Sequence, residues 1–153
     1  MDHQPEQKTD RRQALAVLAR ANSAELAAAW EALSDAPAIE TLRDSEIGLV
    51  MARGRVGGGG AAFNLGEVTV SRATVRLASG EVGIGHVMGR DTGRALMVAR
   101  FDALWQSPGH RGWVETAVVA PVSQRLAKAD AETRAKAAAT RVNFFTMVRG
   151  EDA

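Results

Sequence analysis

Residues 67–77 read Glu67-Val-Thr-Val-Ser-Arg-Ala-Thr-Val-Arg-Leu77 and carry the clearest strand pattern in the chain. The run is rich in β-branched residues, which favour the pleated, half-buried surface of a sheet. Its first valines stand at even positions, whereas Val75 and Leu77 stand at odd ones. Because side chains alternate between the two faces of a sheet, this switch predicts a β-bulge or bend near Arg72 to Thr74.

Further strands are expected on both sides of this run. Ser79-Gly80 is a hairpin turn signal, and residues 82–88 continue as the next strand. Upstream, residues 39–43 and 47–55 are interpreted as two short strands bounded by turn-prone residues. Together these segments predict an antiparallel meander of three or four strands.

Two helices are expected before the sheet. Asp10 with Gln13 forms a capping pair for the first, and Ser23 is interpreted as the N-cap of the second. Neither helix is long enough to be stable alone, so both must pack on the rest of the domain.

Two more helices are expected after the sheet. Asp91 is a good N-cap for one, which ends at Pro108. Residues 113–119 are interpreted as a strand or extended loop, and Pro121 starts a long Ala-rich helix that runs to about Arg141. The predicted fold class is therefore α+β, with N-terminal helices and two later helices packed on an antiparallel sheet.

The length of 153 residues fits one domain, with a flexible N-terminus (residues 1–10) and a single α+β domain (residues 11–153). The segment from 142 to 149 is apolar on both strand parities, so we expect it to be buried in the domain or at an interface. Cysteine is absent, which excludes disulfides and cysteine-ligated metals from the chain. With neither a secretory signal nor a membrane-spanning run in the sequence, a cytoplasmic location is predicted.

Arginine dominates the positive charge: sixteen of the nineteen basic residues are Arg, although the net charge is only +1. The planar guanidinium suits carboxylates and phosphates, so an Arg-rich middle of the chain indicates anionic partners. An Ala- and Arg-rich composition can equally reflect a GC-rich genome. The near-zero net charge and the lack of a recognised module argue against a nucleic-acid partner.

Three motifs are candidates for binding a ligand or a partner. The stretch Arg53-Gly-Arg-Val-Gly-Gly-Gly-Gly60 can form an anion nest between two guanidiniums, or simply a flexible hairpin connection. Two further arginines share a strand face, where they clamp an anion, form ion pairs within the chain or stay solvated. A last arginine precedes a helix N-terminus. The candidate residues are Arg53, Arg55, Gly57, Gly58, Arg72, Arg76, Arg90 and Asp91.

No catalytic residue and no metal ligand is nominated. His86 and His110 have no carboxylate or cysteine companions at metal-ligand spacing, and His3 lies near the N-terminus. Gly83-Ile-Gly85 with Gly89 lacks the spacing of a dinucleotide-binding fingerprint. The sequence therefore predicts no self-contained active site.

Several blocks taken together resemble the PhnG family, the small G subunit of the bacterial carbon–phosphorus lyase system. They are Arg53-Gly-Arg-Val-Gly-Gly-Gly-Gly-Ala-Ala-Phe63, Gly66 to Leu77, Gly89-Arg-Asp91 followed by Asp102-Ala-Leu104, and Arg141-Val-Asn-Phe-Phe-Thr-Met-Val-Arg-Gly150. The last block is the most distinctive, and the likeness runs from about Leu15 to the end of the chain. In the family a His often follows the Gly-Arg-Asp block, where this chain has Arg94.

The resemblance implies a subunit of a core complex with H, I and J proteins, with which the L protein works. That system transfers the ribose triphosphate unit of ATP, with Mg, onto a phosphonate and forms a ribose 1-phosphonate 5-triphosphate. No cofactor bound by this chain is expected. The apolar tail would supply the partner interface, at Phe144, Phe145, Met147, Val148 and Arg149.

Two functions follow from this interpretation. One is an accessory, non-catalytic subunit of the phosphonate-processing complex, whose apolar tail binds a partner. The alternative is a nucleotide- or triphosphate-binding domain that contributes directly to the transfer through its Arg and Gly residues.

Overall fold

The computed structural model describes residues 10–142. It divides into two compact units, the first ending at Ser123 and the second beginning at Gln124. The first unit contains a sheet and the helices packed on it, and the second contains most of the last helix.

The sheet consists of β1 (Ile39–Arg55), β2 (Ala62–Leu77) and β3 (Val82–Met88), antiparallel in the order β1-β2-β3. The predicted α+β meander is thus confirmed. The prediction of two short strands within β1 is wrong, because the strand is continuous. Register shifts near Arg43 place the turn-prone residues in bulges, so they bend the strand without ending it.

The bulge predicted on β2 lies instead on its neighbour. The pairing of β2 with β3 is unbroken from Val70–Met88 to Arg76–Val82, whereas the shifts in β1 lie opposite residues 72–75 of β2. Val75 is buried on the face that the helices cover, and Val70 is buried on the opposite face. The apolar residues of β2 change from even to odd positions because they are buried on two different faces of the sheet. The change does not mark an irregularity of β2 itself.

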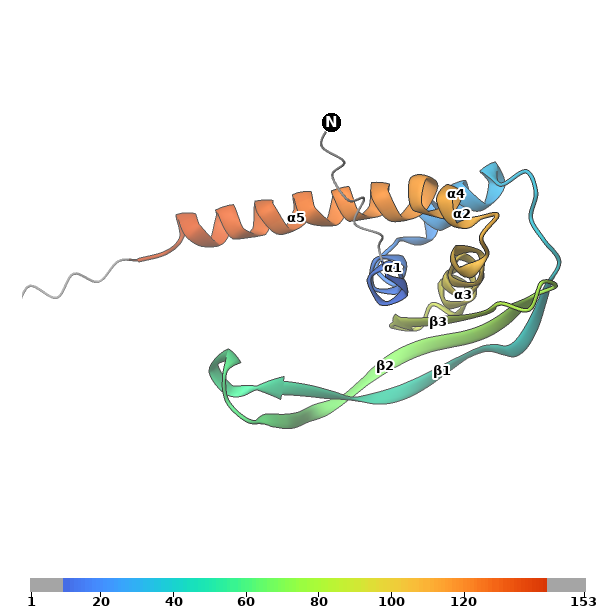
Figure 1. The fold of residues 1–153 in the computed structure, drawn as a ribbon. Helices are drawn as coiled ribbons and strands as arrows, with labels where there is room; N and C mark the ends of the chain where they lie inside the picture. The colour runs from blue at the N-terminus through green and yellow to red at the C-terminus, as the bar shows by residue number, and fades with distance from the viewer. Residues whose placement is uncertain (1–9, 143–153) are drawn as a thin grey trace, which may run out of the picture. The chain divides into compact units, whose positions relative to one another are not determined.

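Helix α3 (Thr92–Gln106) packs directly on β3, as Figure 1 shows. A Cβ atom on Gly83 would overlap the carbonyl oxygen of Ala99 and lie 2.6 Å from the amide nitrogen of Ala103. One on Gly85 would overlap the carbonyl oxygen of Ala95. Close approach of helix and strand therefore requires both glycines and a stripe of alanines, spaced four residues apart along α3.

Helix α3 is central to the first unit, since it also contacts α1 (Arg11–Leu18), α2 (Ser23–Ala32) and α4 (Arg111–Val114). The core combines aliphatic side chains from these helices and from β2 and β3 with one central aromatic ring. Its largest fully buried apolar side chains are Leu18, Leu26, Val75, Val87, Val98, Phe101, Leu104, Val114, Val118 and Val122.

Both N-terminal helices begin with capping boxes. The predicted pair of Asp10 and Gln13 caps α1. The cap of α2 is Asn22 with Glu25, so the prediction that Ser23 is the N-cap is wrong by one residue. The Asn22 side chain accepts a hydrogen bond from the Glu25 amide and leaves the Ser23 hydroxyl free to bond elsewhere.

Residues 113–119 are helical, which corrects the prediction of a strand or extended loop. They belong to α4 and to a π-helical turn, η2 (Glu115–Val119), that leads into α5 (Ala120–Ala139). Val114, Val118 and Val122 are all buried at a spacing of four residues, the period of a helix face. The β-branched composition favoured a strand, but packing on a single face determined the outcome.

The second unit is described up to Val142 and consists of the remainder of α5 with the residues that follow it. Leu126 is half-buried, and the described residues beyond it are exposed. The helix begins next to Pro121, as predicted, and ends at Ala139. Among the described residues, none of the helices combines the length and the apolar character needed to cross a bilayer.

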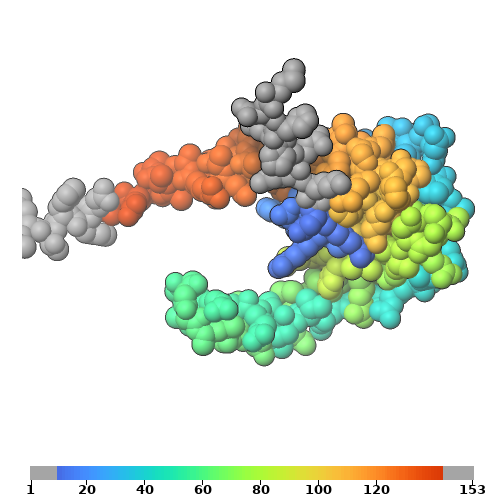
Figure 2. All heavy atoms as spheres, in the orientation of Figure 1, coloured from blue at the N-terminus to red at the C-terminus, as the bar shows by residue number. Residues whose placement is uncertain are grey.

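Strands β1 and β2 extend well past the end of β3. Pairing with β3 stops at Val70, so residues 49–55 and 62–69 pair only with each other and form a two-stranded ribbon closed by the 3₁₀ turn η1 (Val56–Gly58). Ile47 and Gly48 lie at the base of this ribbon, where they pair with Ser71 and Val70. We call residues 47–69 the hairpin arm. Figures 1 and 2 show it as a narrow projection from the sheet. The glycine-rich stretch is thus the connection of a β-hairpin.

Candidate functional site

The five arginines predicted to bind a ligand or partner do not converge on one site. Arg53 and Arg55 lie at the end of the hairpin arm, and Arg72 and Arg76 lie in the part of β2 that pairs with β3. Arg55 pairs with Ala62, fourteen residues before Arg76, which corresponds to about 45 Å along an extended strand. The structure therefore separates four of them into a tip group and a sheet group, and the fifth, Arg90, lies between β3 and α3.

The sheet group forms ion pairs within the chain. Arg72 Nε donates to Glu46 Oε1 at 2.8 Å, and Arg76 donates to Glu40 Oε2 at 2.7 Å. Both carboxylates come from β1, so each pair bridges two strands on the face that the helices leave open. All four side chains are about half exposed, so each pair contributes well under 1 kcal/mol. These two guanidiniums are already neutralised.

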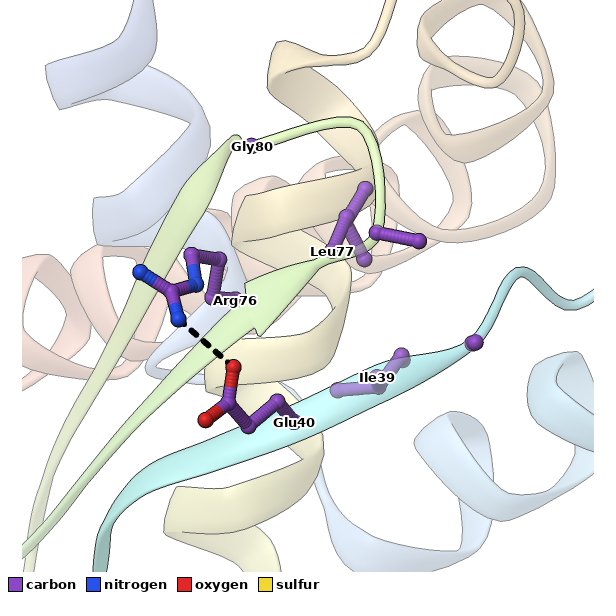
Figure 3. Close-up of a pocket in the computed structure, with 7 residues that line it drawn as sticks. Ile39, Glu40, Arg76, Leu77 and Gly80 are labelled. Atoms are coloured by element: carbon purple, nitrogen blue, oxygen red, sulfur yellow. Dashed lines mark hydrogen bonds and ion pairs between the residues drawn. The ribbon is translucent and has the colours of Figure 1, made fainter.

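A shallow cavity of about 580 Å³ lies where β1 begins and β2 ends, beside the turn between β2 and β3. Figure 3 shows the Arg76–Glu40 ion pair reaching across it between the two strands, with Ile39, Leu77 and Gly80 around them. Because the cation in this cavity is matched by a carboxylate, the cavity has no net attraction for an anion.

Asp91 acts as the N-cap of α3, as predicted. Its carboxylate accepts hydrogen bonds from the Arg94 amide at 2.9 Å and from the Ser23 hydroxyl at 3.1 Å. The hydrogen bond from the Arg94 amide is the main reason that the pKa of Asp91 lies below its usual value. Arg90 beside it is exposed. Asp91 thus joins α2 to the start of α3, and its groups are used in the fold.

Arg94 has a structural role as well. Its guanidinium donates to the carbonyl oxygens of Ala19 and Ala21, at 3.1 and 3.3 Å, and to that of Met88 at 3.0 Å. It therefore joins the end of α1 and the end of β3 to the first turn of α3 and satisfies carbonyl groups that a helix and a strand leave unpaired at their ends.

The tip group has a different environment. Arg53, Arg55 and Gly58 line a cavity of about 510 Å³ together with Gly54 and Ala62. No carboxylate of the described residues lines it. Arg55 donates one hydrogen bond to the carbonyl oxygen of Gly60 at 3.2 Å, which holds the guanidinium against the loop. Gly57 and Gly58 have φ values of +60° and +78°, which only glycine adopts without strain.

Two histidines, His86 and His110, lie among the described residues. His110 lies within hydrogen-bond distance of the Ser107 hydroxyl and the Asp35 carbonyl, and His86 is exposed on β3. In residues 10–142 no three potential ligands among His, Asp and Glu gather as a metal would require.

The ion pair of Asp102 and Arg11 was not predicted from the sequence. Asp102 is 1% exposed and receives two bonds from the Arg11 guanidinium, at 2.8 and 3.1 Å. It also accepts from the backbone amide of Ile84 at 2.9 Å, while Arg11 and Gln106 donate to the carbonyl of Val82. This network occupies the free edge of β3 and raises the pKa of Arg11, chiefly through its hydrogen bond to Asp102. The position of Asp102 among the apolar residues of α3 was the feature of the sequence that could have indicated a buried ion pair.

Comparison with known families matches residues 9–150 to the family described as phosphonate metabolism protein PhnG. The chain belongs to the PhnG family. A curated relative from Rhizobium meliloti (strain 1021), named alpha-D-ribose 1-methylphosphonate 5-triphosphate synthase subunit PhnG, is 57% identical over 145 residues. The match covers 93% of this chain and 90% of the relative.

The PhnG resemblance inferred from the sequence is therefore confirmed, and the match spans both structural units. The predicted partner-binding residues of this PhnG-family chain in the C-terminal segment lie outside the described residues. Phe144, Phe145, Met147, Val148 and Arg149 thus remain a prediction.

Proposed function

We propose that this chain is an accessory, non-catalytic subunit of the carbon–phosphorus lyase core complex. In this role it supports the ATP-dependent formation of a ribose 1-phosphonate 5-triphosphate in phosphonate breakdown. Its partners are the H, I and J core proteins, the L protein acts with them, and ATP with Mg is a substrate of the complex. The name of the relative supports this role, because it describes a synthase subunit.

The observation that carries the proposal is the apolar surface of the hairpin arm. Ile47, Leu49 and Met51 alternate along one face of β1 and are 49%, 61% and 50% exposed. On the opposite face, Phe63 and Leu65 lie over Gly54 and are 42% and 65% exposed. Apolar side chains thus stand uncovered on both faces of the same ribbon.

A two-stranded ribbon is at best marginally stable in water, and exposed apolar patches on folded proteins mark interaction sites. Fully burying one large apolar side chain contributes about 2 kcal/mol. Covering the exposed halves of these five would contribute roughly 5 kcal/mol before the costs of association. A protein partner that encloses the arm supplies that cover.

The arm also leaves backbone groups available for pairing. β1 is an edge strand of the described sheet, and the other edge, β3, is occupied by Arg11, Asp102 and Gln106. The half of β1 that lies in the arm has side-chain alternation suited to a further strand. This supports a partner that contacts the arm through both its backbone and its apolar side chains.

The test is co-expression with the H, I and J proteins and purification through a tag on a partner. We expect the wild-type chain to co-purify and the double variant Leu49→Asp, Met51→Asp to be lost from the complex, because carboxylates replace apolar contacts. Ala28→Asp is the matched control, since it places the same carboxylate on an exposed position of α2.

Circular dichroism and the melting temperature of each purified variant show that it is folded. A double variant that assembles as well as the wild type would exclude the arm as the contact surface. A wild-type chain that ignores all three partners would overturn the proposed function itself.

A further inference from the structure

The arginines at the tip of the hairpin arm differ from those on the sheet, because no carboxylate between residues 10 and 142 lies beside them. Arg72 and Arg76 each bind a glutamate, whereas the cavity lined by Arg53 and Arg55 is formed by glycines and an alanine. The cross-strand neighbours of the two tip arginines are Asn64 and Ala62, both uncharged. The tip therefore presents two positive charges that no described residue neutralises.

The loop between the two strands has the geometry to add backbone donors to these charges. Gly57 and Gly58 are consecutive residues with positive φ, and nothing lies within 4 Å of where their side chains would be. Consecutive amides in such a turn point toward one side and form a concavity that attracts anions. The turn is fixed by the Gly60 amide, which donates to the Val56 carbonyl at 3.0 Å.

Arg55 is held beside this loop. Its Nη1 donates to the Gly60 carbonyl at 3.2 Å, and the guanidinium keeps four other N–H donors for a ligand. Arg53 stands two residues earlier on the same face of β1, about 7 Å away along the strand. Two planar donor groups at this spacing, next to a concave loop, suit an anion with more than one phosphate group.

We propose that the tip, defined as residues 53–60, binds the phosphate chain of a polyphosphate anion, such as the triphosphate of a nucleotide. The proposal deepens the proposed function and rests on it for the choice of anion, because the complex would use a nucleoside triphosphate and make a triphosphate product. The guanidiniums bind the phosphate oxygens and the loop amides fix their position. No bond is made or broken by this chain.

The test is isothermal titration calorimetry of the full chain and of the assembled complex. The ligands are tripolyphosphate, ATP with and without Mg, methylphosphonate and inorganic phosphate. We expect saturable binding of tripolyphosphate and ATP, weaker binding of the two single-group anions, and a loss of affinity as salt increases. Equal affinity for ATP and tripolyphosphate shows that the phosphate chain, and not the base, is recognised.

Substitutions decide whether the tip is responsible. Arg53→Ala and Arg55→Ala should each lower the affinity for tripolyphosphate about tenfold or more, because each removes charge-assisted hydrogen bonds. Arg43→Ala removes a charge from the same strand outside the tip and should leave the affinity within twofold. Arg53→Lys should recover part of the loss, since it keeps the charge without the planar fork.

The glycine loop offers a second matched pair. Gly58→Ala puts a methyl group on a residue at φ +78°, whereas Gly59→Ala puts the same group at φ −120°, and neither meets an atom within 4 Å. We expect Gly58→Ala to weaken tripolyphosphate binding several-fold and Gly59→Ala to leave it unchanged. Equal affinity of the two variants for tripolyphosphate would show that the loop does not contribute to the anion site.

The outcomes separate this proposal from the proposed function. If the complex assembles but neither the chain nor the complex binds tripolyphosphate, the anion site is wrong and the accessory role stands. Binding that survives both arginine substitutions also overturns it. If the chain binds tripolyphosphate through the tip but never associates with the H, I and J proteins, the accessory role fails and the anion site remains.

Discussion

Gly83 and Gly85 determine how closely α3 approaches the sheet. At both positions a Cβ atom would overlap a carbonyl oxygen of α3, and backbone atoms cannot move aside as a flexible side chain would. Gly83 faces Ala99 and Ala103 of the alanine stripe on α3, and Gly85 faces Ala95 and Ala99. The pattern Gly83-Ile-Gly85, which superficially resembles a dinucleotide-binding motif, therefore serves the packing of α3 on β3.

Gly85→Ala should lower the free energy of unfolding by about 3 kcal/mol, because the added methyl group forces the strand and the helix apart. Urea unfolding followed by circular dichroism measures this. Gly112→Ala is the control: Gly112 lies in α4 with nothing near its Cβ position, so the change should be neutral or stabilise by up to about 1 kcal/mol. Equal stability of the two variants would contradict the close packing of α3 on β3.

Arg11 and Asp102 differ sharply in exposure, at 42% and 1% of their side-chain areas. Arg11→Met would leave the buried Asp102 carboxylate without its counter-ion, at a cost of about 3–5 kcal/mol. Arg12→Met is the control, because Arg12 is an exposed neighbour in the same helix and its loss should change stability by less than about 0.5 kcal/mol.

Asp102→Asn should cost less than Arg11→Met, since the amide oxygen can still accept the bond from Ile84. Thermal unfolding of the three variants side by side gives the order. If Arg11→Met proved as stable as Arg12→Met, the ion pair would not contribute to the edge of β3.

Among the elements, β2 combines two environments in one strand. From Val70 to Arg76 it lies between β1 and β3, and from Ala62 to Thr69 it pairs with β1 alone. The first part is covered by α3, whereas the second carries exposed apolar side chains. The difference should appear in local stability, because opening the arm disrupts few buried contacts.

Hydrogen–deuterium exchange of the free chain should show this difference. We expect peptides from residues 62–68 to exchange at least tenfold faster than peptides from residues 70–76. In the assembled complex the arm should become protected, while the central part of β2 changes little. Uniform slow exchange along the whole of β2 in the free chain would show that the arm needs no partner to be stable.

At the scale of the whole molecule, several of the charged side chains considered as ligand-binding candidates instead form contacts that stabilise the fold. Asp91 and Arg94 join α3 to its surroundings, and Arg72 and Arg76 bridge strands. Among the described residues, the hairpin arm combines a row of exposed apolar side chains with Arg53 and Arg55, whose cavity is lined by no described carboxylate. The apolar faces of the arm suit a protein partner, and its tip suits an anion.

Local patterns in the sequence were sufficient to predict the α+β class, the bounds of β3, the caps formed by Asp10 and Asp91, and the family. These features depend on neighbouring residues, since a cap, a turn and a strand period are all read within a few positions. The interpretation of residues 113–119 was wrong because Val114, Val118 and Val119 favour a strand by their β-branched side chains, whereas in the fold they are buried along a helix.

The tertiary structure alone decided which arginines remain available and which are neutralised. Arg72 and Glu46 are 26 residues apart in sequence, and Arg11 and Asp102 are 91 residues apart. Coulombic and hydrogen-bond partners at such separations depend on strand register and helix placement, which local patterns do not encode. The sequence by itself determined most of the elements and the family. The pairing of β1 with β2 determined that Arg53 and Arg55 lie together at the tip of the arm, opposite uncharged residues.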